Sequence, residues 1–531
     1  KLLTALLCGA LMLTSLAGCG QGAGNQSGTS AGSESAVKDE LVFVNYRDIR
    51  DLNPHLYAGE MYAQSILYDT LVSNTSEGYV GCLAEDWTIS EDGRTYTFNI
   101  RDGVTFSDGT PCDANAILAN FNAILENRER HTWLEMMNLL VGVSAPDDDT
   151  FVIEMSEPYY PMLTELACIR PFAMISPNCM IDGSTKDGVN GYIGTGPYVL
   201  TDFVTDEYAV FERNENYWGE KPAIRKITVK VIPDNQTRIM ALENGEIDLI
   251  FGKNMLDADA ISQYVDSDKF TVGLSDPTST RHIVLNTTHD ILGDKSVRQA
   301  LQHATNRQAI SEGIFYGLEP AADTLYSTTV PYCDVDLEPY AYDADEAARL
   351  LDEAGWTMGS DGVRAKDGQK LALDLLYNSD SVTEKTISEY LQSEYLKLGI
   401  SLNIHGEEEQ SYRDNMKAGN FDMVFNICWG MPYDPQSSLA AMRAPVYGDY
   451  AAQQGLEDKA EIDQAITDIL TSTDETKRQE LYTFVLTRLH EDAVYIPLTF
   501  ETNKALYTSD LKGVHFGTDQ YDVDFASMYF A

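Results

Sequence analysis

Segments with the pattern of a β-strand alternate along this chain with segments with the pattern of an α-helix. Strands are predicted at 95–100, 227–232 and 246–251, and an apolar stripe at the helical period begins at Val297. Asp343 and Glu346 approximate a helix capping box. No unit of about 20 to 50 residues recurs, so an α/β or α+β fold is favoured over a solenoid.

The stretch that follows Arg94 shows this pattern in its clearest form. In a strand, the alternating residues that begin at Thr95 place three apolar side chains on one face: Tyr96, Phe98 and Ile100. Asp102–Gly103 predicts a turn, after which a second strand is expected. Asp113 is a residue type that caps helices, and apolar residues follow it at the helical period: Ala114, Ile117, Leu118, Phe121, Ile124 and Leu125. The predicted order is strand, turn, strand, helix.

The size and charge of the chain exclude some classes of protein. With 531 residues, 44% of them hydrophobic, the chain can bury more than one core, because single cores stop growing at about 250 to 300 residues. The 37 Lys and Arg residues face 83 Asp and Glu residues, a net charge of -46. Such a field repels phosphate backbones, so no nucleic-acid partner is expected. The acidity also keeps an exposed protein soluble and indicates nothing about a ligand.

Motifs that would indicate an enzyme or a metal site are missing from the sequence. The eight cysteines include no C-x-x-C pair, and the eight histidines include no H-x-H or H-E-x-x-H. No G-x-S-x-G elbow and no phosphate loop is found. We therefore expect neither catalysis nor a catalytic cofactor.

The first residues have the features of an export signal followed by a tether. Residues 2–16 form an apolar run too short to span a bilayer, and Leu16-Ala17-Gly18-Cys19 resembles a bacterial lipobox. We expect a signal peptide at 1–18, with Cys19 as the site of lipid attachment. The Gly-, Ser- and Ala-rich residues after Cys19 predict a flexible tether over 19–36 with a reach of about 20 to 25 Å. The protein is thus expected to be extracytoplasmic and anchored to the bacterial cell membrane.

Several segments after the tether resemble the peptide- and nickel-binding family of importer-associated solute-binding proteins: Leu83–Phe121, Gly194–Tyr217, Trp218–Pro222 and Val231–Asp234. The resemblance implies an α/β, two-lobed periplasmic-binding-protein-like fold of type II, with a hinge and a cleft between the lobes. Residues 37–275 and 495–531 would form the first lobe, with an extra subdomain near 70–190, and residues 276–494 the second. It also implies a monomer that works with the permease of an ATP-driven importer.

Other segments are closer to the nickel-binding branch of that family than to the peptide branch: Leu52–Tyr57, Arg128–Glu135, Ala322–Leu325 and Trp429–Pro435. This likeness implies that the cargo is nickel, or another divalent metal, bound to a small carboxylate chelator such as histidine.

Two arginines and five further side chains match positions that contact the ligand in the nickel-binding branch. Arg130 and Arg170 each offer a guanidinium fork that suits a carboxylate, although surface ion pairs are the commoner use of arginine. The cavity walls would be flat rings and a polarisable sulfur: Tyr57, Met61, Trp133, Trp429 and Tyr433. For these residues ordinary core packing is the alternative.

The sequence departs from the nickel-binding branch at one expected metal ligand. Members of that branch carry a histidine two residues after the proline of a Met-Arg-x-Pro segment, whereas here Met442–Pro445 is followed by Val446 and Tyr447. No protein ligand for the metal is therefore assigned. A chelator can fill the coordination shell of the metal by itself, and another metallophore or a metal-free cargo stays open.

A short peptide is the alternative cargo. In that case Asp434 would pair with the α-amino group of the peptide, although an Asp before Pro435 is also a common turn residue.

Overall fold

The computed structural model describes residues 38–57, 59–75, 78–252, 255–428, 435–517 and 521–531. Residues Asp39–Ala531 form one compact unit. The predicted signal peptide at 1–18, the tether with Cys19, and the predicted site residues Trp429 and Tyr433 lie outside the described residues.

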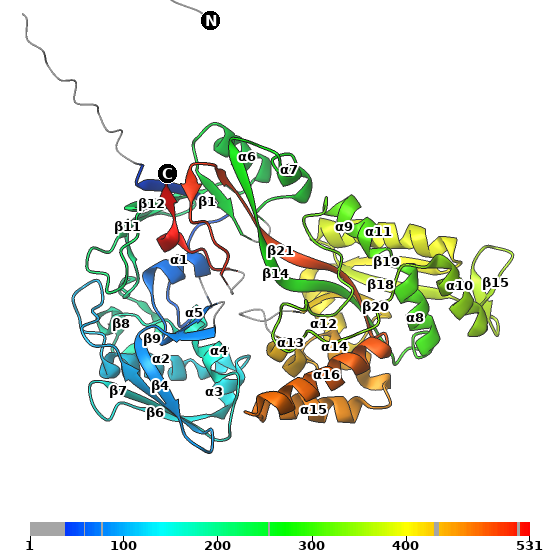
Figure 1. The fold of residues 1–531 in the computed structure, drawn as a ribbon, viewed down its shortest axis with the longest axis horizontal. Coiled ribbons are helices and arrows are strands. Elements are labelled where there is room, and N and C mark those ends of the chain that lie inside the picture. Colours follow the sequence, from blue (N-terminus) through cyan, green and yellow to red (C-terminus); the bar gives the residue numbers. More distant parts are fainter. Residues whose placement is uncertain (1–37, 58, 76–77, 253–254, 429–434, 518–520) are drawn as a thin grey trace, which may run out of the picture. The chain divides into compact units, whose positions relative to one another are not determined.

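Ten strands form one continuous sheet (Figure 1). Across the sheet their order is β10 (Tyr198–Val204), β11 (Tyr208–Arg213), β12 (Lys226–Val231), β1 (Glu40–Asn45), β13 (Leu249–Phe251), β21 (Tyr495–Thr508), β14 (Phe270–Leu285), β20 (Met423–Cys428), β18 (Ala372–Asn378) and β19 (Ser401–Glu407). β1 pairs in parallel with β12 and β13, and β18 pairs in parallel with β19 and β20.

The two longest strands, β14 and β21, join these two parallel groups. They run antiparallel side by side (Figure 1), and the paired residues extend from Phe270 and Thr508 to Val284 and Tyr495. The register shifts around Pro277, which lacks a backbone N–H, and again after Arg281. The two strands are therefore paired from end to end, but the register of the pairing is irregular near the middle.

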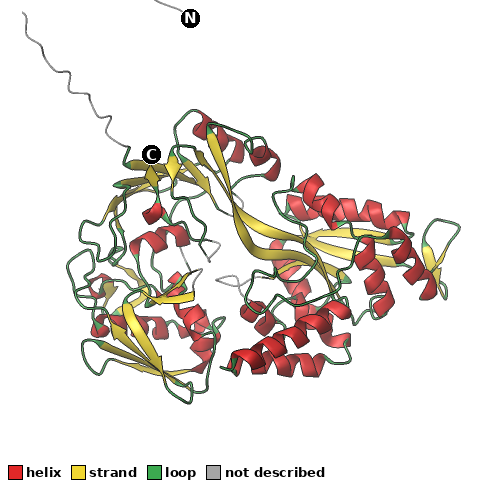
Figure 2. Cartoon of the chain, in the orientation of Figure 1, coloured by secondary structure: helices red, strands yellow, loops and turns green. Residues whose placement is uncertain are grey.

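Smaller sheets and the helices complete the unit (Figure 2). A four-stranded sheet has the order β4 (Ala84–Ile89), β5 (Thr95–Ile100), β7 (Thr150–Met155) and β6 (Leu140–Ser144). A three-stranded sheet contains β15 (Thr357–Met358), β16 (Arg364–Lys366) and β17 (Gln369–Lys370). The pairs are β2 (Val72–Thr75) with β3 (Gly78–Gly81), β8 (Met180–Ile181) with β9 (Ser184–Val189), and β22 (Leu511–Lys512) with β23 (Tyr529–Phe530).

The helices of the first half of the chain are α1 (Met61–Leu67), α2 (Ala114–Glu126), α3 (Glu135–Leu139), α4 (Met162–Leu166), α5 (Ile169–Phe172), α6 (Asn235–Glu243) and α7 (Ala258–Ser262). Those of the second half are α8 (Lys295–Ala304), α9 (Arg307–Ile314), α10 (Ala344–Glu353), α11 (Val382–Lys397), α12 (Glu409–Ala418), α13 (Pro435–Ala441), α14 (Gly448–Ala452), α15 (Lys459–Thr471) and α16 (Glu475–Glu491). Among the residues that the structure describes, no helix has both the length and the apolar character needed to cross a membrane.

The alternation of side chains along the strands explains why helices cover both faces of the sheet around β18. Leu375 packs in a core with residues of α8, α10 and α11, whereas its neighbour Leu376 packs in another core with residues of α12, α15 and α16. Ile283 and Val284 of β14 divide between the same two cores. Because successive side chains of a strand point to opposite faces, both faces of these strands are apolar and buried.

Most local predictions agree with the structure. β5 buries Tyr96, Phe98 and Ile100, and Asp113 caps α2 by accepting a hydrogen bond of 2.9 Å from the backbone N–H of Ala116. The second strand expected after Asp102–Gly103 is wrong, because the chain there forms turns and only one isolated bridge, between Thr105 and Pro111. The strand predicted at 246–251 is shortened to β13, because the N–H of Glu246 instead closes the end of α6.

Candidate functional site

A cavity of about 1120 Å³ lies within the Asp39–Ala531 unit and combines residues that are far apart in the sequence. One group of lining residues comes mainly from the end of β1, the start of α1, the segment before α3, and α5, with others from α6, the end of β13 and the C-terminal segment. The other group comes from the ends of β18 and β20, from α11 and α12, and from the residue that precedes α14. Residues from both parallel strand groups of the large sheet therefore line the cavity.

Tyr57 and Trp133 form an aromatic wall of this cavity. The indole Nε1–H of Trp133 donates to the phenol oxygen of Tyr57, and the two ring centroids are 6.2 Å apart at an interplanar angle of 63°. Both residues remain partly exposed, with accessible fractions of 40% for Tyr57 and 42% for Trp133. Burial raises the pKa of Tyr57, so its phenol keeps its proton at neutral pH. Each ring offers a flat apolar face, and the phenol adds a polar group, so the wall suits a ligand with both apolar and polar parts.

Arg170 lies beside the aromatic wall. Its backbone is extended (φ -120°, ψ 118°) within the short helix α5, and its guanidinium carbon is 6.0 Å from the centroid of the Tyr57 ring. Its Nη2 donates to the carbonyl of Gly59 at 3.0 Å and to Oε1 of buried Gln64 at 3.0 Å. These bonds fix the guanidinium of a half-buried cation at the edge of the cavity, where a carboxylate can meet it.

The second group of lining residues includes two carboxylates. Asn378, at the end of β18, donates its backbone N–H to Glu384 at 2.9 Å and its side-chain amide to Glu409 at 2.5 Å. Glu409 also pairs with Arg413 at 2.5 Å. Burial raises the pKa of Glu384, which lies in the first turn of α11. The cavity thus presents both cationic and anionic side chains.

Tyr447, the residue at the position of the expected histidine, also lines the cavity. It precedes α14, whose second residue, Asp449, is buried and accepts a hydrogen bond of 2.7 Å from the side chain of Asn426. Burial raises the pKa of Asp449 to about 6.

The raised pKa of Asp449 predicts a pH-dependent stability. Between about pH 4 and 6 the folded protein binds more protons at Asp449 than the unfolded chain, so its contribution to the free energy of unfolding falls as the pH rises. The wild-type protein should therefore lose stability over this range relative to the Asp449→Asn variant, by about 3 kcal/mol at most. Urea unfolding of both proteins across the range measures the difference. A difference that stays constant with pH would contradict the prediction.

The structure places the predicted site residues in three groups. Tyr57, Met61, Trp133 and Arg170 line the cavity. Arg130, in the 3₁₀ helix η1 (Arg128–His131), is exposed and is not among the lining residues, so its contact with cargo stays a prediction. Trp429 and Tyr433 lie outside the described residues.

Some lining residues were not identified from the sequence: Asn378, Glu384, Glu409, Arg413 and the Arg47–Glu60 ion pair, 2.5 Å long. The capping pattern of Ser381 with Glu384 predicts the start of α11, but no local signal says that this helix end meets a cavity. Over the described ranges, no group of three or more His, Cys, Asp or Glu side chains could hold a metal ion. The thiol of Cys428 is buried and donates to the carbonyl of Leu325 at 3.0 Å.

Comparison with protein families identifies the class of this protein. The model of bacterial extracellular solute-binding proteins, family 5 (middle region), matches residues 78–449. The chain belongs to this family of solute-binding proteins, and the predicted mixed α/β periplasmic-binding-protein fold is confirmed.

Individual proteins and solved structures that resemble this chain include nickel-binding and peptide-binding relatives. The chain is 41% identical over 496 residues to the nickel-binding periplasmic protein of Escherichia coli (strain K12), covering 92% of this chain and 94% of that protein. It is similar to the crystal structure of NikA from Brucella suis in complex with Fe(III)-EDTA, with a TM-score of 0.89 and 43% identity, covering 93% and 100% of the two chains. It is 26% identical over 506 residues to the dipeptide-binding protein of E. coli (strain K12), covering 89% and 91%.

Proposed function

We propose that this protein is the extracytoplasmic substrate-binding component of an ATP-driven importer. Its cargo is nickel, or another divalent metal, in a complex with a small carboxylate chelator such as histidine. One observation carries the proposal: Arg170 is fixed beside Tyr57 and Trp133 on one wall of a cavity large enough for such a complex. The protein then acts by capture and delivery, and no catalytic step is assigned to it.

Similarity to nickel-binding relatives supports this choice of cargo. The relative at 41% identity is named as a nickel-binding protein, and the structure at 43% identity contains a metal chelated by a ligand that carries carboxylates. In our proposal the guanidinium of Arg170 binds a chelator carboxylate, the rings of Tyr57 and Trp133 contact the flat face of the complex, and Met61 packs beside them. Arg130, Trp429 and Tyr433 complete the proposed set.

Calorimetry of the purified protein tests the proposal. We expect heat of binding with nickel chloride plus L-histidine and none with nickel chloride alone. In the proposed complex the chelator, and not the protein, supplies the ligands of the metal. A titration with histidine alone is the control for binding of the free chelator. If all three titrations give no heat, the proposed cargo is wrong.

A short peptide is the second candidate cargo. Glu384 and Glu409 line the cavity and suit an α-amino group, and the dipeptide-binding relative is consistent with such a ligand. Native mass spectrometry of protein purified from its own host distinguishes the candidates, because a retained peptide and a retained metal chelate differ in mass and isotope pattern.

The membrane anchor is part of the same proposal. Cleavage before Cys19 and acylation of that residue would keep the binding protein at the membrane, close to the permease. Mass spectrometry of the mature N-terminus tests it: a diacylglyceryl-modified Cys19 is the expected result, and an unmodified N-terminus elsewhere would contradict it.

A further inference from the structure

His131 is a buried residue that contacts the aromatic wall from outside the cavity. It is the last residue of η1, has 0% exposure, and is not among the residues that line the cavity. Its Nδ1 lies 3.0 Å from the phenol oxygen of Tyr57, and the centroids of the two rings are 5.4 Å apart. The imidazole therefore contacts Tyr57 at the same oxygen that accepts the hydrogen bond from Trp133.

We propose that His131 is a positioning residue: through its hydrogen bond to Tyr57 it holds the Tyr57–Trp133 wall in the orientation that receives cargo. The effect on cargo affinity rests on the proposed function, whereas the effect on the wall itself does not.

The hydrogen-bonding capacity of the Tyr57 oxygen explains why His131 matters. A phenol has one proton to donate and lone pairs to accept, and the indole of Trp133 can only donate. Tyr57 therefore accepts from Trp133 and has its proton or its other lone pair available for Nδ1 of His131. Either tautomer of the neutral ring completes this bond. The phenol oxygen is thus held from two directions.

Because both rings of the wall are partly exposed, packing alone does not fix their orientation, and the hydrogen bond with His131 adds the missing restraint. Tyr57 and Trp133 are 40% and 42% exposed, so neighbouring atoms restrain each ring on only part of its surface. The χ angles of a half-exposed ring are otherwise restricted mainly by staggered rotamer preferences. Fixing the Tyr57 oxygen fixes the direction of the Trp133 N–H and also the ring face near Arg170, 6.0 Å away.

The charge state of His131 fits a positioning role. Burial lowers the pKa of His131 to about 4, so the ring is neutral at neutral pH. A neutral ring adds no second cation beside Arg170.

A matched pair of variants tests the proposal, because Asn and Leu have nearly the same shape but only Asn can bond to Tyr57. Both His131→Asn and His131→Leu remove the imidazole ring, but Leu is the larger and is apolar whereas Asn buries an amide, so a thermal melt of each variant checks that it folds. In calorimetry with nickel chloride plus L-histidine, we expect His131→Leu to bind about tenfold more weakly than the wild type and His131→Asn to bind within about threefold of it. Equal affinities for the two variants would overturn the proposal.

A second measurement needs no cargo. The fluorescence contribution of Trp133 is obtained by subtracting the spectrum of the Trp133→Phe form of each protein. We expect acrylamide to quench this contribution more strongly in His131→Leu than in the wild type or in His131→Asn. Tyr57→Phe removes the phenol oxygen and with it the bonds to both Trp133 and His131, so it gives the largest increase expected. His131→Phe, which keeps an aromatic ring but has no nitrogen, replaces His131→Leu if that variant does not fold. Unchanged quenching in the variant that folds would overturn the proposal.

The two measurements separate two kinds of failure. If the wild-type protein gives no heat with nickel and histidine, the proposed cargo is wrong, and the quenching data still decide the role of His131.

Discussion

Replacing Arg170 by alanine is expected to weaken binding of the nickel–histidine complex by about 10- to 150-fold. The variant removes the guanidinium that the structure fixes beside the cavity, and a hydrogen bond to a charged group contributes about 1.5 to 3 kcal/mol. Arg170→Lys keeps the charge but not the planar fork, so its affinity should fall between those of the wild type and the alanine variant. Calorimetry with nickel chloride plus L-histidine measures all three.

The control for Arg170→Ala must make the same change of charge away from the cavity. Arg349→Ala on α10 does so, because Arg349 lies on the surface and pairs there with Glu346 and Glu353. Its affinity for the complex should stay within about twofold of the wild type, since exposed ion pairs are screened. Arg170 also bonds Gln64 and Gly59, so a thermal melt of each variant checks the fold. An Arg170→Ala protein that binds as tightly as the Arg349→Ala protein would contradict the proposed site.

Local structure was predictable where adjacent residues determine it. The strand at Thr95–Ile100 and helix α2 follow from side-chain period and from the capping residue Asp113, and both are stabilised by the same buried core. The wrong strand after Gly103 shows the limit of this reasoning. The segment contains a turn and apolar residues, but it forms only a single isolated β-bridge, between Thr105 and Pro111. Tertiary contacts decide whether such a segment extends.

The site was predictable only in part, and for a different reason. Tyr57, Met61, Trp133 and Arg170 line one cavity, but their relation came from resemblance to a family and not from any pattern in their own spacing. Glu384 and Glu409 reach the same cavity from the starts of two other helices, and sequence reasoning missed them because long-range strand pairing brings these helix ends together. No motif in the sequence points to His131, since its contact with Tyr57 depends on tertiary packing.

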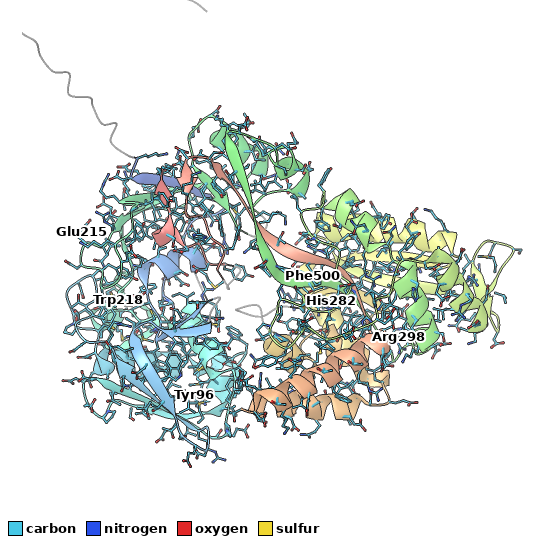
Figure 3. All side chains as sticks on the ribbon, in the orientation of Figure 1. Tyr96, Glu215, Trp218, His282, Arg298 and Phe500 are labelled. Atoms are coloured by element: carbon cyan, nitrogen blue, oxygen red, sulfur yellow. The ribbon has the colours of Figure 1, made fainter. Side chains whose placement is uncertain are left out.

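A buried ion network in the middle of the β14–β21 ladder provides the last prediction. Arg281 of β14 pairs with Glu501 of β21, and Figure 3 labels their chain neighbours His282 and Phe500. Glu319 lies 3.7 Å from Arg281 and 3.1 Å from Lys504, and the side chains of all four residues are at most 12% exposed. The network therefore stabilises the irregular part of the ladder that joins the two strand groups.

Glu501→Ala should lower the free energy of unfolding by about 3 to 5 kcal/mol. The variant leaves the Arg281 guanidinium buried with the longer contact to Glu319, and removing one partner of a buried ion pair costs about this much because the remaining charge is then less well compensated. Glu346→Ala is the matched control, because it removes a carboxylate from an exposed pair with Arg349, for which about 0 to 1 kcal/mol is expected. Urea unfolding followed by circular dichroism measures both variants. If the two lose the same stability, the network does not hold the ladder together, and apolar packing around β14 and β21 must stabilise it instead.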